Sequence, residues 1–227
     1  MFALATLAPL LHPNLSFHYY TRPIPAHLKE NPVGNWAAAL DAGMIHHQVS
    51  MQEYSHIVDT QQPLDTFPTS NCIWIPQGGD QPEAELGIHL LAKELNDFYQ
   101  AESLKDLTVL LPAGTGTTTR YLQKHLTSKI SLFPISCVHR DNLSFFPNGL
   151  ESVSKFAALH PSYMELYTAF FNETGIELDL IYGIPTLFRY LQTAPGGRPV
   201  LILHTGGLEG NSSQMLRYQY WQAKVKP

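Results

Sequence analysis

The sequence predicts an α/β fold with a largely parallel sheet, and three observations support this prediction. Strand-like and helix-like segments alternate along the chain, as they do in proteins built from βαβ units. The apolar run Val109–Leu111 has the character of a buried strand, and a Gly/Thr-rich loop and a helix-like segment follow it. The chain of 227 residues, with 44% hydrophobic content, can bury a sizeable core.

The first 70 residues contain one series of predicted elements. An apolar helix over Met1–Leu11 precedes an aromatic strand over Phe17–Thr21. Gly43 is expected to end the next helix, since glycine readily adopts the left-handed conformation found after helix C-termini. This helix covers Asn35–Ala42, and it is followed by a strand over Met44–Val49 and a short helix over Met51–Val58. The polar stretch Gln61–Ser70 contains two prolines and is expected to cross between two lobes.

A second series of elements fills the rest of the chain. We expect a smaller lobe, N-terminally incomplete, over residues 1–66 and a larger lobe, which carries the Gly/Thr-rich loop, over residues 67–227. The larger lobe is predicted to contain strands at Cys72–Ile75, around Thr108, at Ile130–Ser136 and at Val200–Leu203. Its helices are expected at Glu83–Tyr99, Tyr121–Leu126, Tyr163–Asn172 and Pro185–Leu191.

Composition excludes several classes of function. The formal charge is −5 and basic residues are scattered, which argues against a nucleic-acid surface. Cys72 and Cys137 are the two cysteines, so we expect no disulfide framework and a cytoplasmic location. No apolar run approaches the roughly 18 residues of a membrane span. His46 and His47 are neighbours on a predicted strand and face opposite ways, so a shared metal is not expected.

The segment Gly114-Thr-Gly-Thr-Thr-Thr119, here called the Gly-Thr loop, is the leading candidate for a binding site. A loop of this kind at a helix N-terminus directs backbone N–H groups and hydroxyls toward an anion such as phosphate. It is not a Walker loop, because no Gly-Lys-Ser/Thr follows. Thr119 stands where a dinucleotide fingerprint has its third glycine, which disfavours a nicotinamide or flavin cofactor. A simple connecting turn is the alternative.

Two other glycine pairs also follow strand-like segments. They are Ile75-Pro-Gln-Gly-Gly79, the Gln-Gly-Gly loop, and His204-Thr-Gly-Gly207, the His-Thr-Gly-Gly loop. Ligands of open α/β sheets bind beyond the carboxyl ends of the strands, and glycine lets the backbone approach them closely. The sequence therefore predicts that the three loops line one ligand site.

In this order, the three loops resemble those of pyridoxal-phosphate enzymes with the tryptophan synthase β-like fold. Within that group the chain is similar to the 1-aminocyclopropane-1-carboxylate deaminase / D-cysteine desulfhydrase family. The resemblance implies a two-lobed, three-layer αβα architecture with mainly parallel sheets. The matching pieces run nearly end to end: Asn31-Pro, Gly43-Met44, Ile75–Gly79, Ala113–Thr118, Leu178–Tyr182 and Ile202–Leu208.

The resemblance implies a role for each matching residue. The phosphate of pyridoxal 5'-phosphate would be bound by Gly114, Thr115, Gly116, Thr117 and Thr118. Thr205 would lie at the pyridine nitrogen, and the Tyr182 phenol would take part in proton transfer beside the ring. Gln77, Gly78 and Gly79 would border a small amino-acid substrate. The implied activity is that of a deaminase or lyase, and the resemblance leaves room for a homodimer.

The sequence departs from the family pattern at two places. Gly183-Ile184-Pro185 follows Tyr182, where the family has Thr or Glu and then Gly-Lys. The family's Schiff-base lysine and a Ser-Asn pair lie upstream of the segment that Met1–Ala5 resembles, and Lys29 does not match that lysine. We therefore expect a fragment or shortened relative of such an enzyme. The alternatives are a non-catalytic protein that binds pyridoxal phosphate or another phospholigand without the lysine, and a phosphosugar- or nucleotide-binding domain.

Overall fold

A computed structural model describes residues 1–67, 70–138, 153, 155–193 and 197–225. These residues form two compact units, Met1–Gln77 and Gly78–Pro227. The division lies several residues beyond the expected boundary between residues 66 and 67. The polar stretch expected to cross between lobes belongs to the first unit, although its residues 68–69 lie outside the described part.

The first unit contains a two-stranded parallel sheet and four helices. Strand β1 (His18–Thr21) pairs with β2 (Ile45–Gln48), with Tyr19 opposite His46. The helices are α1 (Phe2–Leu11), α2 (Ala26–Glu30), α3 (Gly34–Asp41) and α4 (Met51–Thr60). Helix α1 contacts α3, and Ala5, Ala39 and Met44 form the buried centre of this unit. The expected helices at Met1–Leu11, Asn35–Ala42 and Met51–Val58 are all present, and so are both strands.

The second unit is built on a three-stranded parallel sheet in the order β4-β3-β5. Strand β3 (Leu107–Ala113) is central and buried at every position, and it pairs with β4 (Ile130–Ser136) and β5 (Val200–Ile202). Because the strands are parallel, their carboxyl ends meet at one edge of the sheet. The segments that leave this edge are therefore neighbours.

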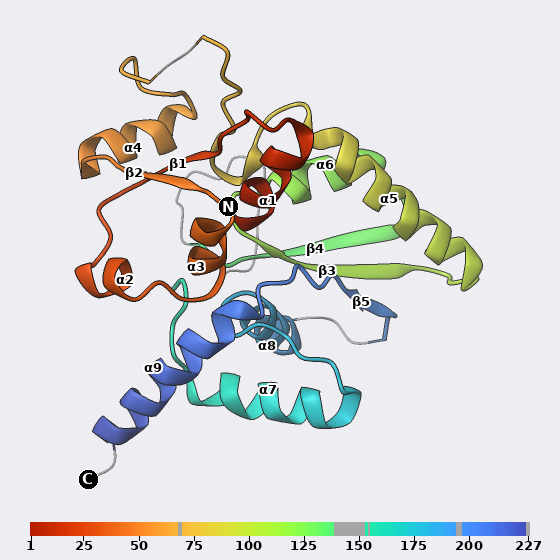
Figure 1. The fold of residues 1–227 in the computed structure, drawn as a ribbon. Helices are drawn as coiled ribbons and strands as arrows, with labels where there is room; N and C mark the ends of the chain where they lie inside the picture. Colours follow the sequence, from red (N-terminus) through yellow and green to blue (C-terminus); the bar gives the residue numbers. More distant parts are fainter. Residues whose placement is uncertain (68–69, 139–152, 154, 194–196, 226–227) are drawn as a thin grey trace. The chain divides into compact units, whose positions relative to one another are not determined.

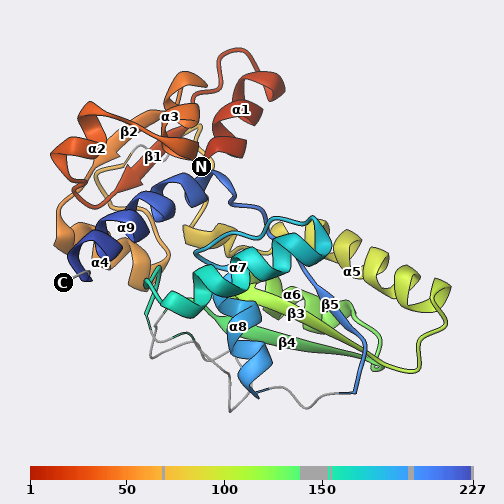
Figure 2. The ribbon, with the colours of Figure 1, turned by 90° about the horizontal axis from the view of Figure 1, so that it is seen from below.

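Helices cover both faces of this sheet (Figure 1). Helices α5 (Ala84–Ala101) and α6 (Thr117–His125) lie on one face. Helices α7 (Pro161–Thr174) and α8 (Gly183–Thr193) lie on the other, and α9 (Glu209–Val225) ends the described chain (Figure 2). Alternate side chains of β3 explain the arrangement, since Leu107, Val109 and Leu111 pack with α5 and α6 while Leu110 packs with α7 and α8. The second unit is thus a three-layer αβα structure.

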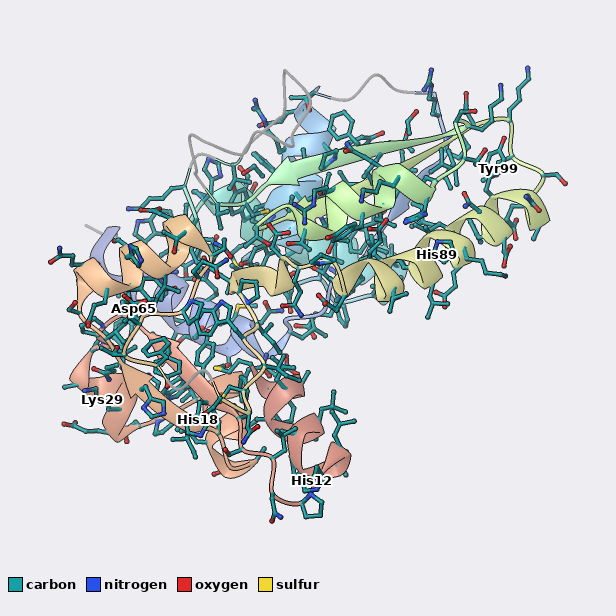
Figure 3. All side chains as sticks on the ribbon, turned by 90° about the horizontal axis from the view of Figure 1, so that it is seen from above. His12, His18, Lys29, Asp65, His89 and Tyr99 are labelled. Carbon is teal, nitrogen blue, oxygen red and sulfur yellow. The ribbon has the colours of Figure 1, made fainter. Side chains whose placement is uncertain are left out.

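Polar contacts fix α5 beside α6. His89, which lies on α5 (Figure 3), has its Nδ1 3.2 Å from Nδ1 of His125, and His125 Nε2 lies 2.9 Å from Glu85 Oε1. The Asn96 side-chain amide donates to the His125 carbonyl oxygen at 3.0 Å. Since α6 begins at the Gly-Thr loop, these contacts hold the helix that follows the loop.

Three parts of the structure differ from the sequence-based expectations. Cys72–Ile75 is not a strand, and Ile73 is 84% exposed, so its apolar side chain is not in the core. Asn71, just before this segment, has a φ of 60°, which is outside the strand region. The short helix α2 and the long helix α9 were not predicted.

Among the residues that the structure describes, each helix is too short or too polar to span a membrane.

Candidate functional site

The Gly-Thr loop connects the central strand of the sheet to a helix of the second unit. Gly116 is the N-cap of α6 with a φ of 90°, a conformation that favours glycine. The first helical hydrogen bond runs from the Arg120 N–H to the Gly116 carbonyl at 2.9 Å. The N–H groups of residues 117–119 therefore have no partner within the helix and point along its axis. This is the geometry that a helix N-terminus offers to an anion.

Hydroxyl groups surround this helix start. Thr115 Oγ1 and Thr117 Oγ1 are 3.1 Å apart, and Thr117 is buried. Thr119 is 1% exposed, and its Oγ1 is among the described buried polar atoms that have no hydrogen-bond partner. An unsatisfied buried hydroxyl costs free energy unless a bound group or water completes its hydrogen bonds. Sequence reasoning had assigned Thr119 no role, since threonine is also ordinary in a first helical turn.

The Gln-Gly-Gly loop packs directly against the Gly-Thr loop. A Cβ atom on Gly78 would lie 2.1 Å from Thr115 Oγ1 and 2.7 Å from Thr115 Cβ, and Gly78 has a φ of 78°. Gly78 therefore lies in contact with Thr115 of the Gly-Thr loop. Gln77 belongs to the first compact unit, whereas Gly78 and Gly79 belong to the second unit together with the Gly-Thr loop.

Two consecutive side chains of α6 hold the residues after Gly79. Arg120 Nη2 donates to the Asp80 carboxylate, and both side chains are largely buried. The Tyr121 hydroxyl donates to the Gln81 carbonyl oxygen at 3.1 Å. An ion pair with restricted solvent access fixes geometry better than an exposed one. Sequence reasoning missed this link, because its partners lie 40 residues apart.

The His-Thr-Gly-Gly loop follows β5 at the same edge of the sheet. The Leu203 N–H donates to the Leu110 carbonyl at 2.9 Å, which continues the pairing of β5 with β3 just before the loop. His204 then closes a small turn: its Nδ1 accepts from the Gly206 N–H at 2.9 Å, and its Nε2 lies 2.8 Å from the Glu177 carbonyl oxygen. Thr205, the residue expected at a ring nitrogen, is exposed.

Tyr182 lies at the start of α8, where Asp179 organises the backbone. Asp179 is 2% exposed, and its carboxylate accepts from the Tyr182 N–H at 2.6 Å. The Tyr182 ring is half-buried and meets Phe156 edge-on at 5.7 Å between centroids. Burial raises the pKa of the Tyr182 phenol, and the nearby ionisable groups Cys137 and Asp179 raise it further. The phenol is therefore protonated at neutral pH.

The loops border open space where a ligand could approach the backbone. A Cβ atom built on Gly79, Gly114 or Gly206 would meet nothing within 4 Å. The space beside Gly114, at the start of the Gly-Thr loop, fits a phosphorylated ligand. The described residues contain no cluster of three side chains suited to a metal ion.

His46 and His47 have separate partners. Nε2 of His46 lies 2.7 Å from Thr21 Oγ1, and Nε2 of His47 lies 2.9 Å from His18 Nδ1. The rings make different contacts, in agreement with their expected opposite orientation on the strand.

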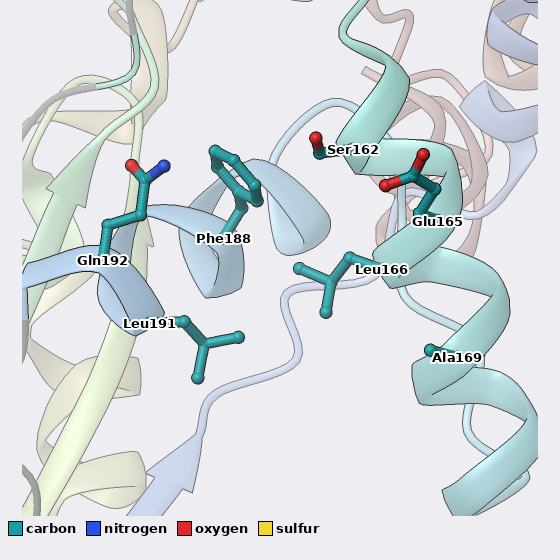
Figure 4. A pocket seen from close by; sticks show the side chains of 7 residues that line it. All are labelled: Ser162, Glu165, Leu166, Ala169, Phe188, Leu191 and Gln192. Atoms are coloured by element: carbon teal, nitrogen blue, oxygen red, sulfur yellow. The ribbon is translucent and has the colours of Figure 1, made fainter.

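A groove of about 380 Å³ lies between α7 and α8 (Figure 4). Its walls include Leu166 and Ala169 from α7 and Phe188 and Leu191 from α8. None of the three loops contributes to its lining, so the groove is separate from the candidate site. Its apolar walls are the outer faces of two packed helices.

A comparison with solved structures identifies the fold. The chain superposes on the crystal structure of an ACC deaminase homologue with a TM-score of 0.67, over 95% of this chain and 74% of that one, at 16% sequence identity. No protein-family model and no curated protein sequence matches the chain. The likeness confirms the α/β fold with parallel sheets, of the tryptophan synthase β-like type.

Proposed function

We propose that the protein binds pyridoxal 5'-phosphate through the Gly-Thr loop and acts as a deaminase or lyase of a small amino acid. The observation that carries this proposal is the start of α6, where unpaired backbone N–H groups and threonine hydroxyls converge beside Gly78. The fold shared with an ACC deaminase homologue supports this cofactor rather than a nucleotide. The family resemblance supports 1-aminocyclopropane-1-carboxylate or D-cysteine as the kind of substrate.

Each predicted site residue of the second unit has a part in this proposal. Residues 114–118 hold the phosphate with N–H groups and hydroxyls, and helix α6 contributes the positive end of its dipole. Thr205 would offer its hydroxyl to the pyridine nitrogen, and Gly78 and Gly79 would border the substrate. Bound pyridoxal phosphate supplies an electron sink for the substrate α-carbon. Tyr182, protonated at neutral pH, is the group that gives or takes a proton beside the ring.

Equilibrium binding of pyridoxal phosphate to the purified chain tests the proposal. We expect saturable binding with a change in the cofactor's visible absorbance, and competition by inorganic phosphate at the Gly-Thr loop. Thr117→Val removes one hydroxyl with little change of shape and is expected to weaken binding. The matched control Thr168→Val makes the same exchange on the exposed face of α7 and is expected to bind normally. No binding, or equal binding by both variants, would contradict the proposal.

A second candidate function is cofactor or phospholigand binding without catalysis. It is favoured by Gly183-Ile184-Pro185, which follows Tyr182 where the family pattern has Thr or Glu and then Gly-Lys. Pyridoxal-phosphate catalysis also needs a lysine amine for its covalent link, and Lys29 does not match the family's lysine. Borohydride reduction of the loaded protein, followed by mass measurement, separates the two functions. A covalent adduct on a lysine favours the enzyme, and binding that remains fully reversible favours the binding protein.

A further inference from the structure

Arg120 joins the Gly-Thr loop to the segment that follows the Gln-Gly-Gly loop. Its backbone N–H donates at 2.9 Å to the carbonyl of Gly116, the N-cap of α6. Its guanidinium Nη2 donates to the carboxylate of Asp80, the residue directly after Gly79. The same residue therefore closes the first turn of α6 with its backbone and reaches the neighbouring loop with its side chain.

A second connection runs through Tyr121, the next residue of α6. Arg120 Nη2 donates to the Tyr121 hydroxyl oxygen at 3.1 Å, and that hydroxyl donates to the Gln81 carbonyl oxygen at 3.1 Å. The Gln81 N–H in turn donates to the Gly79 carbonyl oxygen at 2.8 Å. Two consecutive side chains of α6 thus hold residues 79–81.

Asp80 brings a negative charge to this part of the molecule. The Gly-Thr loop and the Gln-Gly-Gly loop contain no charged side chain, and Asp80 directly follows the second of them. The side chains of Arg120 and Asp80 are 29% and 18% exposed, so water screens their charges less than those of an exposed pair. Lys124, farther along α6, is paired with Glu85 at 3.0 Å. Arg120 is therefore the cation that compensates Asp80.

An unpaired carboxylate at Asp80 would oppose the binding of an anion at the start of α6. The N–H groups and hydroxyls of the Gly-Thr loop carry only partial charges. Asp80 lies two residues beyond Gly78, which contacts Thr115 of this loop. Arg120 lies four residues beyond Gly116, which is a rise of about 6 Å along the helix. Full charges at such separations change the binding free energy of an anion even when water partly screens them.

We propose that Arg120 is a positioning residue that makes this site selective for phosphate-bearing ligands: it compensates the charge of Asp80 and holds the Gln-Gly-Gly loop beside the Gly-Thr loop. The inference rests on the proposed function, because it concerns the anion bound at the start of α6. Loss of Arg120 leaves a negative charge beside the anion, whereas loss of the Asp80 charge leaves a positive one. The two partners therefore affect anion affinity in opposite directions. An ion pair that only stabilised the fold would be damaged from either side alike.

Binding of inorganic phosphate to the cofactor-free protein, measured by equilibrium dialysis, tests this inference. We expect Arg120→Gln to bind phosphate about three- to tenfold more weakly than the unmodified protein, and Asp80→Asn to bind it more tightly. The double variant should recover affinity, because no charge remains unpaired. Arg120→Lys keeps the charge and should bind phosphate nearly normally. These differences should shrink between about 10 mM and about 150 mM ionic strength, because the Debye length falls from about 30 Å to about 8 Å.

An exposed ion pair of α5 supplies the matched controls. Lys93 and Asp97 are paired at 2.6 Å, and their side chains are 65% and 59% exposed. Lys93→Gln and Asp97→Asn change the net charge as the two test variants do, and both should leave phosphate affinity unchanged. If Arg120→Gln does not fold, the comparison of Asp80→Asn with Asp97→Asn gives the same test, because only Asp80→Asn should bind phosphate more tightly.

The possible results are distinct. Weaker phosphate binding by Asp80→Asn, unchanged affinity in both single variants, or equal effects in the controls would overturn the inference. So would an unmodified protein that binds no phosphate. The predicted pattern with inorganic phosphate, together with no binding of pyridoxal phosphate, would contradict the proposed function and leave the inference standing. Pyridoxal phosphate binding that both single variants weaken equally would support the proposed function and overturn the inference.

Discussion

Replacing Gly78 by alanine tests the contact between the Gln-Gly-Gly loop and the Gly-Thr loop. Its φ of 78° is left-handed, which costs a residue with a Cβ about 1–2 kcal/mol. The new Cβ would also lie 2.1 Å from Thr115 Oγ1 and 2.7 Å from Thr115 Cβ and Cγ2. Rotation of the threonine cannot relieve all three contacts, because its Cβ does not move with χ1. Overpacking of this kind costs about 1–3 kcal/mol more.

Gly79→Ala is the matched control for this substitution. Gly79 has a φ of 64°, so alanine at this position has a similar backbone cost. The added Cβ would meet nothing within 4 Å. The difference between the two variants therefore isolates the contact with Thr115. We expect Gly78→Ala to be about 1–3 kcal/mol less stable than Gly79→Ala. We also expect it to bind pyridoxal phosphate more weakly than Gly79→Ala, because the new Cβ displaces Thr115 of the Gly-Thr loop.

Two measurements complete this test. Urea unfolding at equilibrium gives the stability of each variant, and equilibrium dialysis gives its affinity for pyridoxal phosphate. Adding Thr115→Gly to Gly78→Ala removes the three clashing atoms, so the double variant should recover part of the lost stability, with a coupling energy of about 1–3 kcal/mol. Equal stability and affinity of the Gly78→Ala and Gly79→Ala variants would refute the packing of Gly78 against Thr115.

Three further predictions concern hydroxyl, phenol and thiol groups. Thr117→Val should weaken pyridoxal phosphate binding about 10- to 100-fold, because hydrogen bonds to a charged group contribute about 1.5–3 kcal/mol. An unchanged affinity in equilibrium dialysis would contradict this prediction. Tyr182→Phe should lower kcat about 10²- to 10⁴-fold with little change in cofactor affinity, and a steady-state assay that finds normal kcat would remove Tyr182 from the proton transfer. Burial raises the pKa of the Cys137 thiol from 9.0 to about 11 in the folded protein. As pH rises above 9, the thiol therefore ionises first in the unfolded protein. The free energy of unfolding should then fall by about 1.4 kcal/mol per pH unit until pH reaches about 11. Denaturant unfolding at several pH values should show a shallower dependence in Cys137→Ala than in Cys72→Ala, which changes an exposed cysteine, and equal slopes would show that Cys137 is not the group responsible.

Apolar runs bounded by turn residues made much of the second unit predictable. The strand Ile130–Ser136 was expected with the bounds that the structure has, and the buried run Val109–Leu111 lies within β3. Both strands are covered by helices on two faces, so nearly continuous apolar character is their sequence signal. The segment Cys72–Ile75 is also apolar, but it pairs with no strand among the described residues. Its exposed Ile73 shows that apolar composition alone does not make a strand.

The candidate site was predictable in its parts but not in its contacts. Glycine pairs after strand-like segments indicated the loops, because glycine permits the positive φ found at Gly78 and Gly116. The contact of Gly78 with Thr115 depends on tertiary packing, for which local sequence gives no signal. Asp179 did have a local signal, since aspartate before a helix is a common N-cap, but three accepted hydrogen bonds require the folded turn.

The central claim is that the start of α6 is the phosphate site of a pyridoxal phosphate-binding protein. A crystal structure of the chain soaked with pyridoxal phosphate tests it most directly. We predict the phosphate oxygens within hydrogen-bond distance of the backbone N–H groups in residues 115–119 and of the Thr117 hydroxyl. A phosphate bound elsewhere on the protein, or a Gly-Thr loop without the cofactor at saturating concentration, would contradict the claim.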